Sequence, residues 1–361
     1  MKTKKRSFAA IFGPLAIPLI AVALLVIFNL IRDPSFFGIE IKYNIDGNAV
    51  LSGNLITIIN GASELAILAM GMTLVTAACG GQDISVGAAA AIAGSVFVKI
   101  LKSASEIGGG TVVLAFLAAC VVAMIFGAFN GSLVAIFKIQ PMIATLILYT
   151  CGRSIAYWIN GGATPTVESP IISAWGGFIP GVPIPTPVLI VIIMAIIFTL
   201  VFRFTSLRLM TQAVGINESA AKLNGINTTF IKLLSFIILG VCVAVAGSIG
   251  VSRLGLINHE TLLLDVEMDT ILAVAIGGNS LGGGRFRLSG SIIGAYVIQM
   301  LTTTLYAMKV PSTDVKAYKA IVIIILVVIG SPVVKKNFAK FMSDIRRKKA
   351  QKADQSEKGA A

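Results

Sequence analysis

Long apolar stretches separated by short polar intervals make up most of this chain. Several reach about 20 residues with almost no charge, the length at which a helix crosses a hydrocarbon layer of about 30 Å. The apolar positions are continuous and do not alternate with polar ones, which favours helices over barrel strands. The pattern therefore predicts an all-α polytopic membrane protein with about ten spans, at 12–31, 55–78, 88–101, 112–137, 142–159, 187–202, 230–251, 270–276, 288–308 and 320–330.

Two glycine-rich tracts interrupt the apolar pattern. Residues 80–87 read GGQDISVG and residues 277–284 read GGNSLGGG, with three identical and two similar positions. Each tract follows an apolar span, which indicates a weak internal repeat, although a match this short also arises by chance. Transporters built from repeats often place broken helices near the substrate path. Both tracts are therefore candidates for shaping a transport path.

A long polar interval at 206–232 lies between two of the predicted spans. Asn217 suits an N-cap, Glu218 suits a first helical turn, and Gly225 suits the position just after a helix. The interval therefore predicts a surface helix of about two turns, with Asn227 capping the next span. Such a short helix is marginal alone and needs a partner surface; an ordinary structured loop is the alternative. The predicted contact residues are Gly215, Asn217, Glu218, Ala221, Lys222 and Gly225.

Composition supports a membrane domain. Of the 361 residues only 12% are charged, about half the share typical of soluble domains, and the mean hydropathy is +0.92. We expect one transmembrane domain over residues 1–334, with a cytoplasmic segment at 206–229. A basic cytoplasmic tail, partly disordered, is expected over residues 335–361.

The net charge of +13 is interpreted as a signal of topology. Basic residues lie at the ends of spans and in the tails, and no basic stretch interleaved with aromatics suggests nucleic-acid binding. With ten spans, both termini lie on one side together with most of the 29 Lys and Arg residues. The positive-inside rule then places both termini and the segment 206–229 in the cytoplasm.

Motifs for chemistry are missing from the sequence. The tract 277–284 is not a phosphate loop, because no G-x-x-x-x-G-K-[S/T] segment occurs in the chain. His259 is the one histidine, and the four cysteines have no metal-ligand spacing. We therefore expect no catalytic residue, no metal site and no cofactor bound by this chain.

Polar side chains inside apolar spans are costly in lipid and usually face a protein interior or a water path. Arg153 and Glu64 fit either a path lining or a structural pair between helices. Asp83 fits helix capping better than direct substrate contact. The predicted path residues are Asn60, Glu64, Asp83, Ser85, Asn130, Arg153 and Asn279.

Four stretches resemble the permease subunits of bacterial ABC importers for simple sugars, the ribose and galactose permease family. They are residues 80–94, 129–148, 213–226 and 264–286, and the resemblance extends over nearly the whole chain. The segments KIQPMIATLIL and GGGRF are most similar to the galactofuranose-type permease of that family. Gln82, where the family usually has isoleucine, and an insertion near 43–54 depart from the family pattern.

The resemblance implies a type II ABC importer-like permease fold in the bacterial inner membrane. It implies a second permease chain, identical or paralogous, and an extracytoplasmic sugar-binding protein. It also implies ATPase subunits that use ATP and Mg²⁺ and dock on a coupling helix at 213–226. An ABC permease for an amino acid or nucleoside is the alternative, followed by an ion-coupled secondary transporter, for which Glu64 is the one good intramembrane carboxylate.

Overall fold

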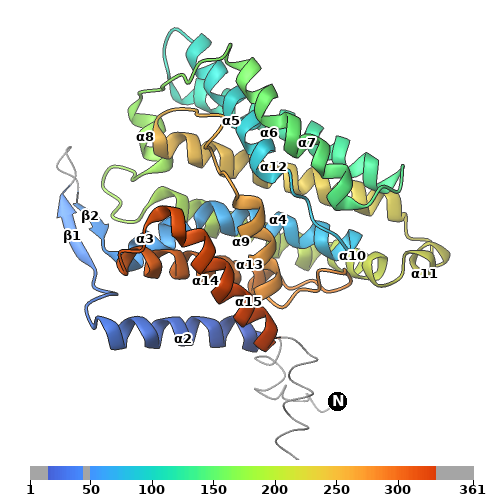
Figure 1. Ribbon diagram of the computed structural model, residues 1–361. Helices are drawn as coiled ribbons and strands as arrows, with labels where there is room; N and C mark the ends of the chain where they lie inside the picture. The colour runs from blue at the N-terminus through green and yellow to red at the C-terminus, as the bar shows by residue number, and fades with distance from the viewer. Residues whose placement is uncertain (1–14, 44–48, 331–361) are drawn as a thin grey trace, which may run out of the picture. The chain divides into compact units, whose positions relative to one another are not determined.

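The computed structural model describes residues 15–43 and 49–330 (Figure 1). The chain divides into two units, one up to Met308 and one from Lys309 onward, and each is described by itself. The predicted tail at 335–361 and the first residues of the predicted first span lie outside the described residues.

The first unit is built from helices and one small hairpin. Its elements are α2 (Ala16–Arg32), β1 (Glu40–Tyr43), β2 (Ala49–Ser52), α3 (Asn54–Gly61), α4 (Ser63–Cys79), α5 (Val86–Ser103), α6 (Gly109–Ala135), α7 (Pro141–Ile159), α8 (Pro170–Gly176), α9 (Thr186–Phe204), α10 (Leu207–Ile216), α11 (Glu218–Leu223), α12 (Thr228–Leu254), α13 (Val266–Ile276) and α14 (Leu288–Ala307). In the second unit, α15 (Ser312–Gly330) begins directly after Pro311.

Seven helical stretches in the described residues are long and apolar enough to cross a membrane. They are α3 with α4, α5, α6, α7, α9, α12 and α14. Three other predicted spans correspond to α2, α13 and α15, of which α2 and α13 have 17 and 11 residues. A polytopic helical membrane protein is therefore confirmed, whereas the count of ten spans and the cytoplasmic termini stay predictions.

The core of the first unit is formed by α4 and α12. Every residue of α4 from Ser63 to Ala78 is buried, and α12 packs against α4, α5 and α6. The contact between α6 and α12 is close because Gly127 faces the backbone of Phe236 and Gly240 faces the backbone of Ala123. Small residues permit such close helix approach in membrane proteins, where burial from water supplies little driving force between helices.

Two local predictions were wrong. An all-α protein was predicted, but the interval between the first two predicted spans contains an antiparallel strand pair, with Glu40 opposite Ser52 and Tyr43 opposite Ala49. The helix α8 lies between the spans predicted at 142–159 and 187–202, where no helix was predicted. Both elements are short, so they left little periodic signal in the sequence.

The helices of the first unit run between two ends. One end, called here the α10–α11 end, holds α10, α11 and the glycine tracts that follow α4 and α13. The opposite end holds the β1–β2 hairpin, where the Leu51 amide donates to the Pro183 carbonyl. Lys138, Arg203, Arg208, Lys222, Lys232, Arg285 and Arg287 all lie at the α10–α11 end.

Candidate functional site: a capped surface helix and the junction beneath it

The predicted surface helix is present as α11. Asn217 is its N-cap, and the Asn217 side chain accepts a hydrogen bond from the Ala220 amide at 3.0 Å. Gly225 has a φ of +81° and ends the helix. Its amide donates to the Lys222 carbonyl, and the next amide, that of Ile226, donates to Ala221, which is a Schellman motif. The Asn227 side chain caps α12 by accepting from the Phe230 amide at 2.9 Å. All three predicted capping positions are confirmed.

Glu218 ties α11 to the helix bundle. Its carboxylate lies 2.6 Å from Lys232 of α12, 3.0 Å from Lys138 of the α6–α7 loop and 3.3 Å from Lys222 of α11 itself. Thr228 also donates to this carboxylate at 3.1 Å. The strongest of these contacts is with Lys232, whose side chain is 10% exposed, because screening by water is weakest there. Glu218 therefore holds three chain segments together at the α10–α11 end.

The same contacts set the ionisation of Glu218. The hydrogen bond from Lys232 lowers the pKa of this carboxyl well below its usual range; partial burial opposes the shift, and Lys138 and Lys222 reinforce it. A lowered pKa in the folded state stabilises the fold above the unfolded-state pKa, and this stabilisation is lost as pH falls toward the folded-state pKa.

We therefore expect the difference in melting temperature between the wild type and Glu218→Gln to stay constant from about pH 5.5 to 8. It should shrink below about pH 4, where the unfolded carboxyl, with a pKa near 4.3, takes up its proton. Thermal unfolding of the detergent-purified proteins across this range checks the prediction. A difference that changes between pH 6 and 8 would contradict it.

Gly215 lies beneath α11 and does not belong to its outer surface. It is in the last turn of α10, where a Cβ would collide with the Ala77 carbonyl of α4 and lie 2.6 Å from the Gly284 amide nitrogen. That Gly284 amide donates to the same Ala77 carbonyl at 3.0 Å. Gly215 therefore lets α10 touch α4 and the tract 277–284 together.

The two glycine-rich tracts contact each other at this junction. The Gln82 side chain donates to the Leu281 carbonyl at 2.9 Å, and Gly80 faces the backbone of Gly282. Gly283, with a φ of +90°, packs against both Gly80 and the Gly215 carbonyl. The breaks after α4 and α13 and the end of α10 thus form one backbone-to-backbone junction, called here the glycine junction. A displacement of α10 would therefore move the backbone of both glycine tracts directly.

Asp83 and Ser85 of the first glycine tract form a buried polar group with Asn130 of α6. Asp83 accepts from the Ser85 amide at 2.7 Å and from the Ser85 hydroxyl at 2.6 Å, while Asn130 of α6 donates to Ser85 at 2.9 Å. All three residues are at most 4% exposed. The N-cap of α5 is Ser85, so Asp83 forms an Asx turn just before the helix instead of capping it directly.

We expect Asp83→Ala to lower stability by about 1–3 kcal/mol, because it leaves buried donors of Ser85 without an acceptor. Thermal unfolding in detergent measures the change, with Glu106→Ala as the control, since Glu106 is exposed. Equal melting temperatures for the two variants would show that the buried group contributes nothing.

The other predicted path residues do not join this group. Arg153 donates to the backbone carbonyls of His259, Glu260 and Leu262, at 2.8–3.2 Å. Arg253 donates to the Asn60 side chain at 3.2 Å and pairs with Glu64 at 3.1 Å. Both sets of contacts lie at the end opposite to α10 and α11. They fit the alternative of structural contacts between helices, which the sequence left open beside a path lining.

Asn279 holds the second glycine tract in place. Its side chain accepts from the Arg287 amide at 2.7 Å and donates to the Ser291 hydroxyl at 2.8 Å. The structure therefore brings Asp83, Ser85 and Asn130 together and joins Asn60 to Glu64 through Arg253, but it leaves Arg153 and Asn279 apart from both groups. A role of these residues in the transport path stays a prediction.

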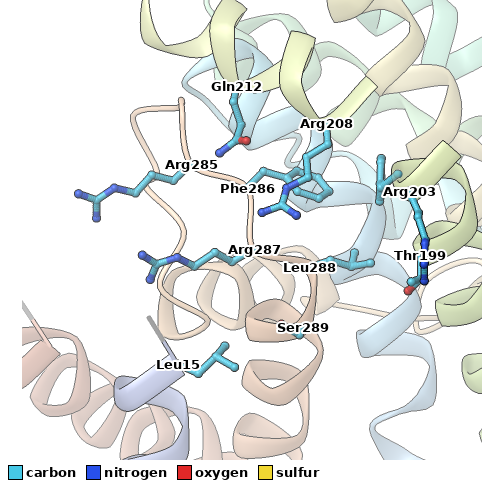
Figure 2. A pocket seen from close by; sticks show the side chains of 11 residues that line it. Leu15, Thr199, Arg203, Arg208, Gln212, Arg285, Phe286, Arg287, Leu288 and Ser289 are labelled. Carbon is cyan, nitrogen blue, oxygen red and sulfur yellow. The ribbon is translucent and has the colours of Figure 1, made fainter. Parts of the chain in front are cut away.

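A cavity of about 720 Å³ beside α10 was not predicted from the sequence (Figure 2). Its described lining includes four arginines from three segments and no acidic residue. Single arginines at span ends were interpreted as topology signals, and their convergence depends on the tertiary arrangement. The lining residues are Leu15, Thr199, Phe202, Arg203, Arg208, Gln212, Arg285, Phe286, Arg287, Leu288 and Ser289.

Apolar helices packed around the buried helices α4 and α12 define a multi-pass helical membrane protein. A family described as the branched-chain amino acid transport system permease component matches residues 54–330, and the chain belongs to this family. The prediction of a permease in the inner membrane is thereby confirmed.

Several curated relatives are sugar permeases. The galactofuranose transporter permease protein YtfT of Escherichia coli K12 is 39% identical, over 91% of this chain and 92% of that protein. The fructose import permease protein FruF of Bifidobacterium longum is 34% identical, over 93% and 91% of the two chains. The ribose import permease protein RbsC of E. coli K12 is 32% identical, over 86% and 92%. No solved structure gives a significant match.

Proposed function

We propose that this chain is the membrane-spanning permease subunit of an ATP-driven importer for a simple sugar. The observation that carries the sugar assignment is the full-length similarity to galactofuranose, fructose and ribose permeases. Galactofuranose is the first candidate, because its permease shares 39% identity with this chain. The proposal includes an extracytoplasmic sugar-binding protein and a second permease chain, either a copy or a paralogue.

The proposed docking site for the ATPase subunit is α11. Glu218 joins this helix to α12, while Ile216, the last residue of α10, and Leu223, the last residue of α11, are 74% and 90% exposed. Exposed large apolar side chains on an otherwise polar segment favour contact with a protein partner. With α11 on the cytoplasmic side, as the basic residues at this end favour, a cytoplasmic ATPase reaches it.

Energy would pass from the ATPase to the transport path through the glycine junction. Movement of α11 acts on α10, and Gly215 of α10 touches both Ala77 of α4 and Gly284. The buried pair of helices and the two glycine breaks would then move between two arrangements that favour opposite access of the path. In this scheme the ATPase binds ATP and Mg²⁺. The permease supplies the transport path and the helices α10 and α11 that transmit the movement to it.

Uptake by proteoliposomes tests the proposal. The vesicles contain the permease with the ATPase and binding protein of the same transport system, and labelled galactose, ribose, fructose and leucine are compared. We expect ATP-dependent uptake of one of the sugars. Leucine uptake would favour an amino-acid permease, which is the second candidate because the family is described as a branched-chain amino acid permease component. Uptake without ATP, driven by an ion gradient, would exclude an ATP-driven importer.

A further inference from the structure

Two of the four arginines of the cavity beside α10, Arg285 and Arg287, flank a buried aromatic residue, Phe286. Phe286 is 3% exposed, and its ring meets that of Phe202 of α9 edge-to-face with centroids 4.6 Å apart. Because Phe286 points inward, the adjoining Arg285 and Arg287 are fixed beside the cavity. Figure 2 shows Arg285 and Arg287 extending in the same direction from their segment, while Arg208 reaches from α10 toward Phe286.

The charge around the cavity has one sign. Arg203 and Arg208 come from the α9–α10 region, and Arg285 and Arg287 from the segment before α14. No carboxylate is among the described lining residues. Partial burial, and then the positive charge of Arg285, lower the pKa of Arg287, as expected where like charges lie near one another. A surface with this charge attracts anions.

The start of α14 adds further attraction for an anion. The N-cap of this 20-residue helix is Arg287, which makes no side-chain capping bond, and Leu288 and Ser289 of the first turn line the cavity. Backbone amides at a helix start carry a partial positive charge and bind phosphate groups. Guanidinium groups are also well matched to phosphate oxygens.

The position and the walls of the cavity favour a lipid over a soluble anion. It lies where α9 ends and α14 begins, and both are membrane-span candidates, so it is at the level of the lipid headgroups. An exposed stripe on one face of α9 leads from it toward the middle of the span. The stripe consists of Ile192, Ile196, Thr199 and Arg203.

We propose that this cavity binds the phosphate of an anionic phospholipid headgroup, with an acyl chain lying along the exposed stripe of α9. Arg208 and Arg285 bind the headgroup from the two sides, and the first turn of α14 contributes backbone amides. Basic pockets between membrane helices are suited to anionic headgroups. Because Arg208 belongs to α10, the lipid also steadies the helix that carries the glycine junction.

Native mass spectrometry of the purified full-length chain tests the proposal. The protein is supplied with equal amounts of phosphatidylglycerol and phosphatidylcholine that carry the same acyl chains. We expect selective retention of phosphatidylglycerol, reduced at least about tenfold in the double variant Arg208→Gln, Arg285→Gln, a change that corresponds to about 1.4 kcal/mol. Equal retention of the two lipids by the wild type, or unchanged retention by the variant, would overturn the proposal.

The matched control is Lys99→Gln with Lys102→Gln. It removes the same charge from exposed positions near the end of α5, about 20 Å along that helix from its start. This variant should retain phosphatidylglycerol as the wild type does; a similar loss would show that net charge alone explains binding. Arg208→Lys with Arg285→Lys keeps the charge and should retain an intermediate amount.

A second measurement does not depend on the variants. Phosphatidylglycerol with a photoreactive acyl chain should crosslink to wild-type peptides that cover 192–203, and crosslinks confined to other helices would contradict the proposed path. Displacement of the lipid signal by inorganic phosphate, without any crosslink to α9, would assign the cavity to a soluble anion.

The double variant Arg208→Gln, Arg285→Gln also tests for a protein partner. If this variant retains the lipid but no longer co-purifies with the ATPase, the cavity is a protein contact.

Discussion

Replacing Gly215 by alanine is expected to abolish transport and to destabilise the protein. The new Cβ would collide with the Ala77 carbonyl and approach the Gly284 amide, and both are backbone atoms that cannot rotate away. Overpacking of this kind costs about 1–3 kcal/mol or more, so we expect the melting temperature to fall by about 5 °C. Uptake by proteoliposomes should fall at least about tenfold, because α10 can no longer seat against α4.

Gly110→Ala is the matched control for this substitution. Gly110 lies in the first turn of α6, and a Cβ there has no atom within 4 Å. The same chemical change should therefore be neutral or stabilising, since alanine loses less backbone entropy than glycine when a helix forms. If the two variants had equal melting temperatures and equal uptake, the glycine junction would have no energetic role.

Reversing the charge of Glu218 is expected to have the second-largest effect. Glu218→Arg places a cation among Lys138, Lys222 and Lys232 and leaves the nearly buried Lys232 without its carboxylate. Breaking a fully buried pair costs about 3–5 kcal/mol. Because the Glu218 side chain is 29% exposed, we expect the free energy of unfolding to fall by less, about 2 kcal/mol. The substitution should also detach α11 from α12.

The functional consequence should be uncoupling. We expect Glu218→Arg to insert into the membrane normally, while ATP hydrolysis by the ATPase subunit proceeds without uptake. Parallel assays of phosphate release and labelled-sugar uptake in the same proteoliposomes measure this. Lys99→Gln is the control: it removes one charge from an exposed position on α5, outside the proposed docking helix, and should leave uptake unchanged. Normal uptake by Glu218→Arg would remove the docking proposal for α11.

A double-mutant cycle separates packing from charge. The Glu218 carboxylate compensates the charge of the buried Lys232 ammonium. If this compensation is the main role of Glu218, Lys232→Met should restore part of the stability that Glu218→Gln loses, because no buried ammonium then remains. Additive losses in the double variant would show that the two side chains act independently.

Features of local origin could be predicted from the sequence. Continuous apolar runs predicted the helices, because the length and hydropathy of a span are set by the lipid around it. The caps of α11 and α12 were also predicted, since Asn217, Gly225 and Asn227 act on backbone groups within four residues of themselves. The predicted capping role of Asp83 was wrong, because Asp83 lies two residues before the N-cap Ser85 and accepts from the Ser85 amide, not from an amide of the helix.

Contacts between distant segments could not be predicted in this way. From the sequence, Gly215 was expected at the edge of a docking surface, but the fold places it against Ala77 and the second glycine tract. Glu218 was a first-turn residue by its sequence, and the fold supplies Lys138 and Lys232 as its partners, 80 and 14 positions away. Glycine and glutamate have the same intrinsic properties in either setting, so the neighbouring helices decide their roles.

By itself, the amino-acid sequence determined that this protein is a helical membrane protein with a short helix capped at Asn217 and Gly225, because hydropathy and capping are properties of nearby residues. Its likeness to sugar importer permeases came from motif resemblance. The tertiary structure alone decided that the two glycine tracts meet beneath that helix and that four scattered arginines share one cavity. The physical reason is that both features depend on which helices pack against each other. That choice depends on shape complementarity along whole helices, as at Gly127 and Gly240, and the sequence of one segment alone does not reveal it.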